Sequence, residues 1–164
     1  MKKLSKDFID FFGLLEQYHV AYLVIGGYAV MFYGYPRVPD DLDIFVSPDT
    51  SNIDSLLQAL SEFGFGDLGL TKQDFADPSK MISLGYPPDQ VNIVTGIDGV
   101  SWEQAWAHRV QGRLEGVQIT FISKDDLIKH KRIRNLPQDK MDADMLESKH
   151  GTDRTDPFTE PSIP

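Results

Sequence analysis

Two stretches of the chain decide its fold: LVIGGYAV at residues 23–30 and DDLDIFV at residues 40–46. If the second stretch is a strand, Asp41 and Asp43 share one face, because side chains alternate along a strand, and the residues between and after them enter the core. Two adjacent carboxylates repel each other, and a shared divalent cation that also binds substrate phosphates relieves this repulsion. The acidic strand therefore predicts a Mg²⁺ site and phosphate chemistry.

The first stretch ends a short apolar run with the pair Gly26-Gly27, just before a helix expected over residues 28–33. Alone, this pair fits an ordinary strand-to-helix turn. Without Cβ atoms, however, backbone N–H groups at a helix start can approach a triphosphate closely. The glycine turn and the acidic strand together predict a phosphate-binding site more specifically than either does alone.

The composition limits the class of protein. A chain of 164 residues with 41% hydrophobic and 25% charged residues is expected to form one domain, over residues 1–147, followed by a mobile polar tail at 148–164. No apolar run reaches the length of a membrane span. The absence of cysteine excludes disulfides and thiolate metal sites, so we expect a cytoplasmic protein.

The formal net charge of −9 argues against nonspecific binding to duplex nucleic acid. Five basic residues nevertheless lie within residues 124–134, where they form either a phosphate-binding patch or an ordinary solvated helix face.

Hydrophobic spacing, caps and turn residues predict alternating helices and strands. The expected helices are 5–18, 28–33, 53–63, 101–109, 123–131 and 139–146, and the expected strands are 21–25, 41–46, 81–84, 91–94 and 117–122. Because residues 85–89 join two of the strands as a loop or wide hairpin, we expect an α/β (α+β) fold with a mixed sheet and helices packed on it.

At residues 23–30 and 34–46 the chain resembles the nucleotidyltransferase superfamily with the polymerase-β type fold, in particular the small bacterial AbiEii-like proteins. Weaker similarity continues through residues 84–103 and 126–142, so that the resemblance covers about residues 20 to 146. It implies a nucleotidyltransferase-like fold. It also implies metal-dependent transfer of a nucleoside monophosphate from an NTP to an acceptor, which could be tRNA, a protein or a small molecule.

The resemblance also implies roles for individual residues. Asp41 and Asp43 are the expected catalytic residues and the ligands of Mg²⁺ or Mn²⁺. The expected nucleotide-binding residues are Gly26, Gly27, Arg37 and Lys131.

Three residues near the C-terminal end of the resemblance have open alternatives. Lys131 is either a phosphate contact or a solvent-facing lysine. Asp139 and Asp142 could bind, act as a base or cap the last helix, and we favour capping.

Two positions depart from the family pattern. The third metal carboxylate is replaced by Asn92, and the Thr usually found two positions before the acidic pair is replaced by Pro39. An amide carbonyl can ligate Mg²⁺ but carries no charge. Either the enzyme uses Asn92 as a metal ligand, or Asp89 substitutes, or the protein is a noncatalytic nucleotide-binding or protein-interaction module, for example one half of a toxin–antitoxin-like pair.

Overall fold

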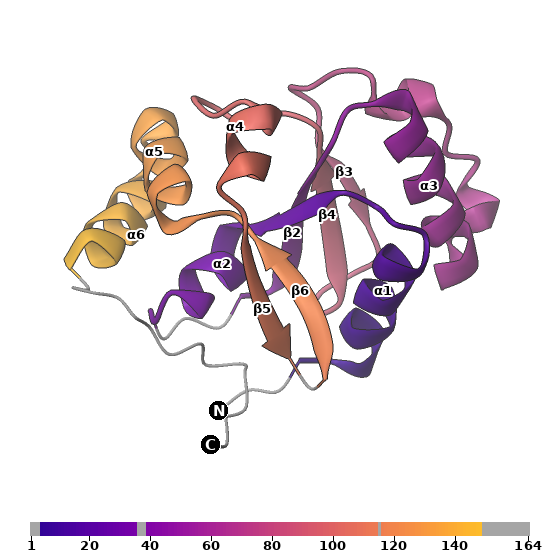
Figure 1. Cartoon of the computed structure of the whole chain (residues 1–164), viewed down its shortest axis with the longest axis horizontal. Coiled ribbons are helices and arrows are strands. Elements are labelled where there is room, and N and C mark those ends of the chain that lie inside the picture. Colours follow the sequence, from indigo (N-terminus) through magenta and orange to yellow (C-terminus); the bar gives the residue numbers. More distant parts are fainter. Residues whose placement is uncertain (1–3, 36–38, 115, 149–164) are drawn as a thin grey trace.

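The computed structural model describes residues 4–35, 39–114 and 116–148, and a mixed six-stranded sheet forms its centre (Figure 1). The strands are β1 (Tyr22–Ile25), β2 (Asp41–Val46), β3 (Ile82–Leu84), β4 (Gln90–Val94), β5 (Val110–Leu114) and β6 (Val117–Phe121). Their order across the sheet is β3-β4-β2-β1-β6-β5. The pairs β1–β6 and β2–β4 are parallel, and the other three pairs are antiparallel.

Helices cover both faces of this sheet. They are α1 (Lys6–Gln17), α2 (Gly26–Phe32), α3 (Thr50–Leu60), α4 (Trp102–Ala107), α5 (Lys124–Arg134) and α6 (Pro137–Ser148), with short helical turns at Ser61–Phe65, Gly66–Leu68 and Lys72–Phe75. Figure 1 shows α1 and α3 on one side of the sheet and α2, α5 and α6 on the other. None of the helices in the described part of the chain is long and apolar enough to cross a membrane.

The two middle strands build the core and aim the acidic pair. All four residues of β1 are buried, whereas β2 alternates at its start. Leu42 and Ile44 are fully buried, and Asp41 and Asp43 are partly exposed on the opposite face. The predicted alternation is confirmed, and both aspartates face the side of the sheet that carries the cavity described below.

Local sequence signals placed most elements correctly. Ser5 caps α1 by accepting the Phe8 N–H at 3.1 Å, and β3 and β4 pair antiparallel, which is the hairpin of the two alternatives, loop or wide hairpin. The mixed sheet with packed helices is confirmed. The predicted tail begins at the last residue of α6, and its remaining residues, 149–164, lie outside the described residues.

Strand β5 was not predicted, and α4 ends two residues before the expected Arg109. The segment Val110–Leu114 has few apolar residues and contains Gly112, so it carries no strand signal of its own. Its partner β6 supplies the pairing. Gly112 is needed there because a Cβ would lie 2.8 Å from Phe32 Cε1 and 3.0 Å from Phe121 Cε2.

Candidate functional site

A cavity of about 460 Å³ opens beside the acidic strand. Asp43 of β2 and Asn92 of β4 lie on its sheet side, next to Gly26. His130, Lys131 and Arg134 of α5 line it from the helix side. The cavity is within the size range of small-molecule sites, and it brings a carboxylate and basic side chains to one space.

The two aspartates meet at a single amide. Asn92 Nδ2 donates to Asp41 Oδ2 at 2.8 Å and to Asp43 Oδ1 at 2.7 Å. Asp43 lines the cavity, whereas Asp41 lies outside its lining. The pKa of Asp43 is raised, mainly by burial, with a smaller contribution from the charge of Asp41. The hydrogen bond from Asn92 and the charges of Lys131 and Arg134 act in the opposite direction and lower this pKa. Asp43 is therefore a carboxylate whose environment favours a nearby cation.

Gly26 makes room for this carboxylate. Its φ is +69°, and a Cβ built on it would overlap Asp43 Oδ2 and lie 2.9 Å from Asp43 Cγ. Gly27, by contrast, is buried inside α2 and does not line the cavity. The structure thus explains why a glycine is needed at position 26: a side chain there would collide with Asp43. The sequence alone indicated only that a glycine lets a phosphate approach the backbone.

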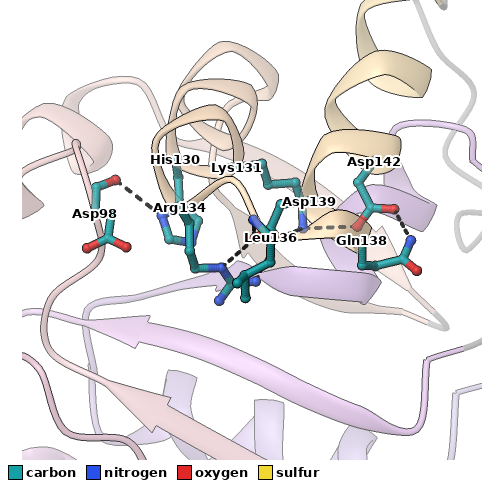
Figure 2. A network of polar contacts seen from close by, with 8 residues as sticks. All are labelled: Asp98, His130, Lys131, Arg134, Leu136, Gln138, Asp139 and Asp142. Carbon is teal, nitrogen blue, oxygen red and sulfur yellow. Dashed lines mark hydrogen bonds and ion pairs between the residues drawn. The ribbon is translucent and has the colours of Figure 1, made fainter.

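Arg134 supplies exposed positive charge on the helix side. Its Nε and Nη2 donate to Asp139 Oδ2 and Oδ1, both at 2.7 Å, so that one edge of the guanidinium is fixed (Figure 2). The side chain is still 43% exposed, and Nη1 donates no hydrogen bond to the described residues. From the sequence, Arg134 was one of several basic residues and was not predicted as a site residue. Its two hydrogen bonds to Asp139, which form when α5 packs on α6, are what identify it.

Lys131 has a different environment. Its side chain is only 4% exposed, with Nζ 3.1 Å from Asp142 Oδ2 and 3.5 Å from Asp139 Oδ1 (Figure 2). The alternative of a solvent-facing lysine is therefore wrong. Asp139 also caps α6, since it accepts the Leu136 N–H at 3.2 Å, whereas Asp142 accepts from Gln138 Nε2 at 2.8 Å inside the helix. Capping is thus confirmed for Asp139 only.

His130 adds a neutral ring to the cavity wall. It is buried, and its Nδ1 lies 3.2 Å from the Asp98 carbonyl oxygen, so Nδ1 carries the proton and Nε2 a lone pair (Figure 2). Burial lowers the pKa of His130; the hydrogen bond to Asp98 opposes this, and the charges of Arg134 and Lys131 reinforce it.

The remaining predicted site residues are placed as follows. Arg37 lies outside the described residues. Asp89 is not part of the cavity lining, and its buried Oδ1 has no hydrogen-bond partner within the described part of the chain. Asn92 turns its amide nitrogen toward the aspartates, while its carbonyl oxygen accepts from Ser83 Oγ and Gln90 Nε2.

The acidic pair fits a divalent cation that a ligand helps to hold. One oxygen of Asp41 and one of Asp43 approach the same nitrogen atom, so the two carboxylates are close enough to share one ion. Carboxylate oxygens are the ligands that Mg²⁺ prefers, and Mg²⁺ is often held by one or two carboxylates plus substrate phosphates. Among the described residues, no group of three or more carboxylate and histidine side chains forms a complete protein cage.

Comparison with known proteins identifies the fold. No family model matches the sequence, and no curated protein matches it either. The crystal structure of the lincosamide antibiotic adenylyltransferase LnuA, bound to lincomycin, is similar with a TM-score of 0.58 at 16% identity, covering 90% of this chain and 99% of that one. An antigenic nucleotidyltransferase-like protein from Paracoccidioides brasiliensis gives a TM-score of 0.51 at 14% identity, covering 88% and 78%. The chain thus has the nucleotidyltransferase fold.

Proposed function

We propose that this protein is a metal-dependent nucleotidyltransferase that moves a nucleoside monophosphate from an NTP, such as ATP, to an acceptor. One observation carries the proposal: a single cavity has Asp43, which Asn92 links by hydrogen bonds to Asp41, on one side and Arg134 on the other. A triphosphate bound with a divalent cation needs negative charge to hold the cation and positive charge to hold the phosphates, and the two sides of this cavity supply them. The fold shared with nucleotidyltransferases agrees with it.

Asp41 and Asp43 are the proposed ligands of Mg²⁺ or Mn²⁺, with Asn92 beside them. A divalent cation at this point would offset the charge on the phosphates and orient them for in-line attack. In the reaction, an acceptor oxygen bonds to the α-phosphorus, the bond from that phosphorus to the bridging oxygen breaks, and pyrophosphate leaves. The acceptor proton passes to Nε2 of His130, the neutral base in the cavity wall.

Arg134 is the proposed contact for the triphosphate, since it keeps an exposed edge while Asp139 fixes the other. Lys131 also lines the cavity and adds positive charge there, although its ammonium is paired with Asp139 and Asp142. Gly26 at the turn, together with Arg37, remains a proposed phosphate contact, whereas Gly27 is buried in α2 outside the cavity lining.

The acceptor is proposed to be a hydroxyl compound. LnuA is named as an adenylyltransferase of lincosamide antibiotics, which makes a small molecule a first candidate, and an RNA such as tRNA or a protein side chain are the others. Because NTPs are cytoplasmic metabolites, the cytoplasm is the proposed location.

A second candidate function is nucleotide binding without transfer, in a protein-interaction module such as the partner of an antitoxin. The orientation of Asn92 favours it, because an amide nitrogen occupies the position between the aspartates where the family places metal.

The two functions are separated by incubating the purified protein with α-labelled NTPs and Mg²⁺ or Mn²⁺ and then offering total RNA, proteins and a panel of small hydroxyl compounds. Transfer requires a labelled acceptor that disappears in the variant Asp41→Asn/Asp43→Asn. The exposed Asp10→Asn variant serves as the control and should keep full labelling. NTP binding in calorimetry without any labelled acceptor would favour the second function.

Arg134 is tested by a matched pair on the same helix. Arg134→Gln should weaken NTP binding at least ~10-fold, because a charge-assisted contact to phosphate is removed. Arg132→Gln should leave it unchanged, since Arg132 pairs with Asp144 and Glu147 and does not line the cavity.

A further inference from the structure

Asn92 stands at the centre of a polar row that crosses three strands. It lies opposite Asp43 on β2 and opposite Ser83 on β3, and it is only 4% exposed. Its Nδ2 donates to Asp41 and Asp43, and its Oδ1 accepts from Ser83 Oγ at 2.7 Å and from Gln90 Nε2 at 2.9 Å. An amide has two N–H donors and two acceptor lone pairs, so every hydrogen-bonding position of Asn92 is used.

The direction of this amide is set by its neighbours. With Nδ2 toward the aspartates, two N–H dipoles point at two carboxylates; the reverse orientation would direct a carbonyl oxygen at both of them. The amide nitrogen therefore supplies partial positive charge at the point where the two carboxylates converge. A divalent cation entering there must displace these two charge-assisted hydrogen bonds.

A free cation that displaces these hydrogen bonds gains few protein ligands. The described residues add no third carboxylate or histidine to the pair, so water must complete the coordination. A triphosphate changes this balance, because its oxygens add both negative charge and ligands to the same ion.

The direction of the hydrogen bonds between Asn92, Ser83 and Gln90 can also reverse. The hydroxyl of Ser83 accepts as well as donates, and the amide of Gln90 can turn to offer its oxygen. After this exchange, the carbonyl of Asn92 faces the aspartates and their cation, and its amide nitrogen donates to Ser83 and Gln90.

We propose that Asn92 is a hydrogen-bonded clamp that holds Asp41 and Asp43 together without a cation, so that the site accepts a divalent ion only together with the NTP. Asn92 is thus a positioning residue that makes cation binding conditional on nucleotide. The proposal rests on the proposed function in that it takes the NTP as the ligand that brings the cation.

The test measures Mn²⁺ binding by the electron paramagnetic resonance signal of the free ion, with and without an NTP analogue that has a methylene group between its α- and β-phosphates. Wild-type protein should bind Mn²⁺ at least ~10-fold more tightly with the analogue than without it. Asn92→Asp, which replaces the clamp by a third carboxylate, should bind free Mn²⁺ at least ~10-fold more tightly than wild type. Gln118→Glu adds the same charge on the exposed surface of β6 and should behave as wild type.

Equal affinity of wild type and Asn92→Asp for free Mn²⁺ would overturn the clamp, even if labelled transfer to an acceptor is observed. Conversely, if the analogue does not bind at all, the proposed function fails, and the comparison of the two proteins with Mn²⁺ alone still decides whether Asn92 excludes the free ion.

A second measurement on the wild type does not depend on the folding of a variant. The side-chain amide signals of Asn92 in ¹⁵N–¹H spectra should move when Mg²⁺ and the analogue are added together, and should not move with millimolar Mg²⁺ alone. The same shift with Mg²⁺ alone would contradict the proposal.

Discussion

Gly26 and Asp43 are packed so closely that no side chain fits between them. A Cβ on Gly26 would overlap Asp43 Oδ2, and the φ of +69° would strain any other residue. We expect Gly26→Ala to lower the free energy of unfolding by about 1–3 kcal/mol. It should also weaken binding of an NTP with Mn²⁺ strongly, because the carboxylate must move. Urea unfolding and titration calorimetry measure the two effects.

Gly69→Ala is the matched control for this substitution. Gly69 has nearly the same φ, +68°, but a Cβ there meets no atom of the described residues within 4 Å. It should lose stability through backbone strain alone and keep nucleotide binding. Loss of binding in both variants to the same extent would show that displacement of Asp43 is not the cause.

Asp43→Asn should stabilise the protein at neutral pH while removing cation binding. Burial, and then the charge of Asp41, raise the pKa of Asp43 above its ordinary 3.8. A carboxyl group with a raised pKa in the fold contributes stability that is complete below the ordinary pKa and is lost as the pH rises through the raised value. The ionised Asp43 is therefore unfavourable at pH 7. We expect a gain of about 1 kcal/mol, or roughly 2–4 °C in Tm.

Thermal unfolding at two pH values checks this prediction. The gain in Tm of Asp43→Asn should be present at pH 7 and shrink at pH 3, where Asp43 itself is protonated. The exposed Asp10→Asn variant should show no such gain. A lower Tm of Asp43→Asn at pH 7 would mean that the lost charge had been stabilising.

The fold and the acidic pair could be predicted because their signals are local. Alternation within β2 places Asp41 and Asp43 on one face whatever the rest of the chain does, and turn residues between β3 and β4 indicate their hairpin. The strand β5 has no such signal and is stabilised by pairing with β6. This difference explains why one edge of the sheet was missed.

The rest of the candidate site depends on contacts between distant segments. Asn92 was recognised as an unusual residue, but the direction of its amide follows from Ser83 and Gln90, which only the assembled sheet brings to it. Likewise, Arg134 and Lys131 lie three positions apart on α5, yet one keeps an exposed edge and the other is enclosed by carboxylates of α6. Sequence spacing cannot separate such roles, because the packing of α5 on α6 decides them.

Lys131→Met should destabilise the fold by about 3–5 kcal/mol, because it leaves the fully buried carboxylate of Asp142 without the Lys131 cation. Urea unfolding measures the loss. Lys129→Met, at an exposed position of the same helix, should change stability by less than about 0.5 kcal/mol.

A double variant separates the ion pair from a role in nucleotide binding. Lys131→Met with Asp142→Leu should regain part of the lost stability, since an apolar pair of similar size can replace a buried ion pair. If Lys131→Met instead folds as stably as wild type and loses NTP affinity, its ammonium acts on the nucleotide and the ion pairs with α6 are unimportant.

Asp139 should make the protein sensitive to acid. Burial alone would raise the pKa of Asp139, but the hydrogen bonds and charge of Arg134, with the Leu136 N–H and Lys131, lower it to about 2. A lowered pKa contributes stability that is complete above the ordinary value of 3.8 and is lost as the pH falls toward 2. The loss from this group should be about 2 kcal/mol.

Arg134→Gln isolates this contribution from the other carboxylates. Without the guanidinium fork, the pKa of Asp139 should move back toward its ordinary value, so the variant starts less stable at pH 5 and loses less on acidification. Arg132→Gln removes only exposed ion pairs with Asp144 and Glu147 and should keep the steep loss of the wild type. Urea unfolding between pH 5 and pH 2 gives the three curves. Parallel curves for wild type and Arg134→Gln would show that Arg134 does not lower the pKa of Asp139. In that case the hydrogen bonds to Asp139 would not hold the guanidinium in place beside the cavity.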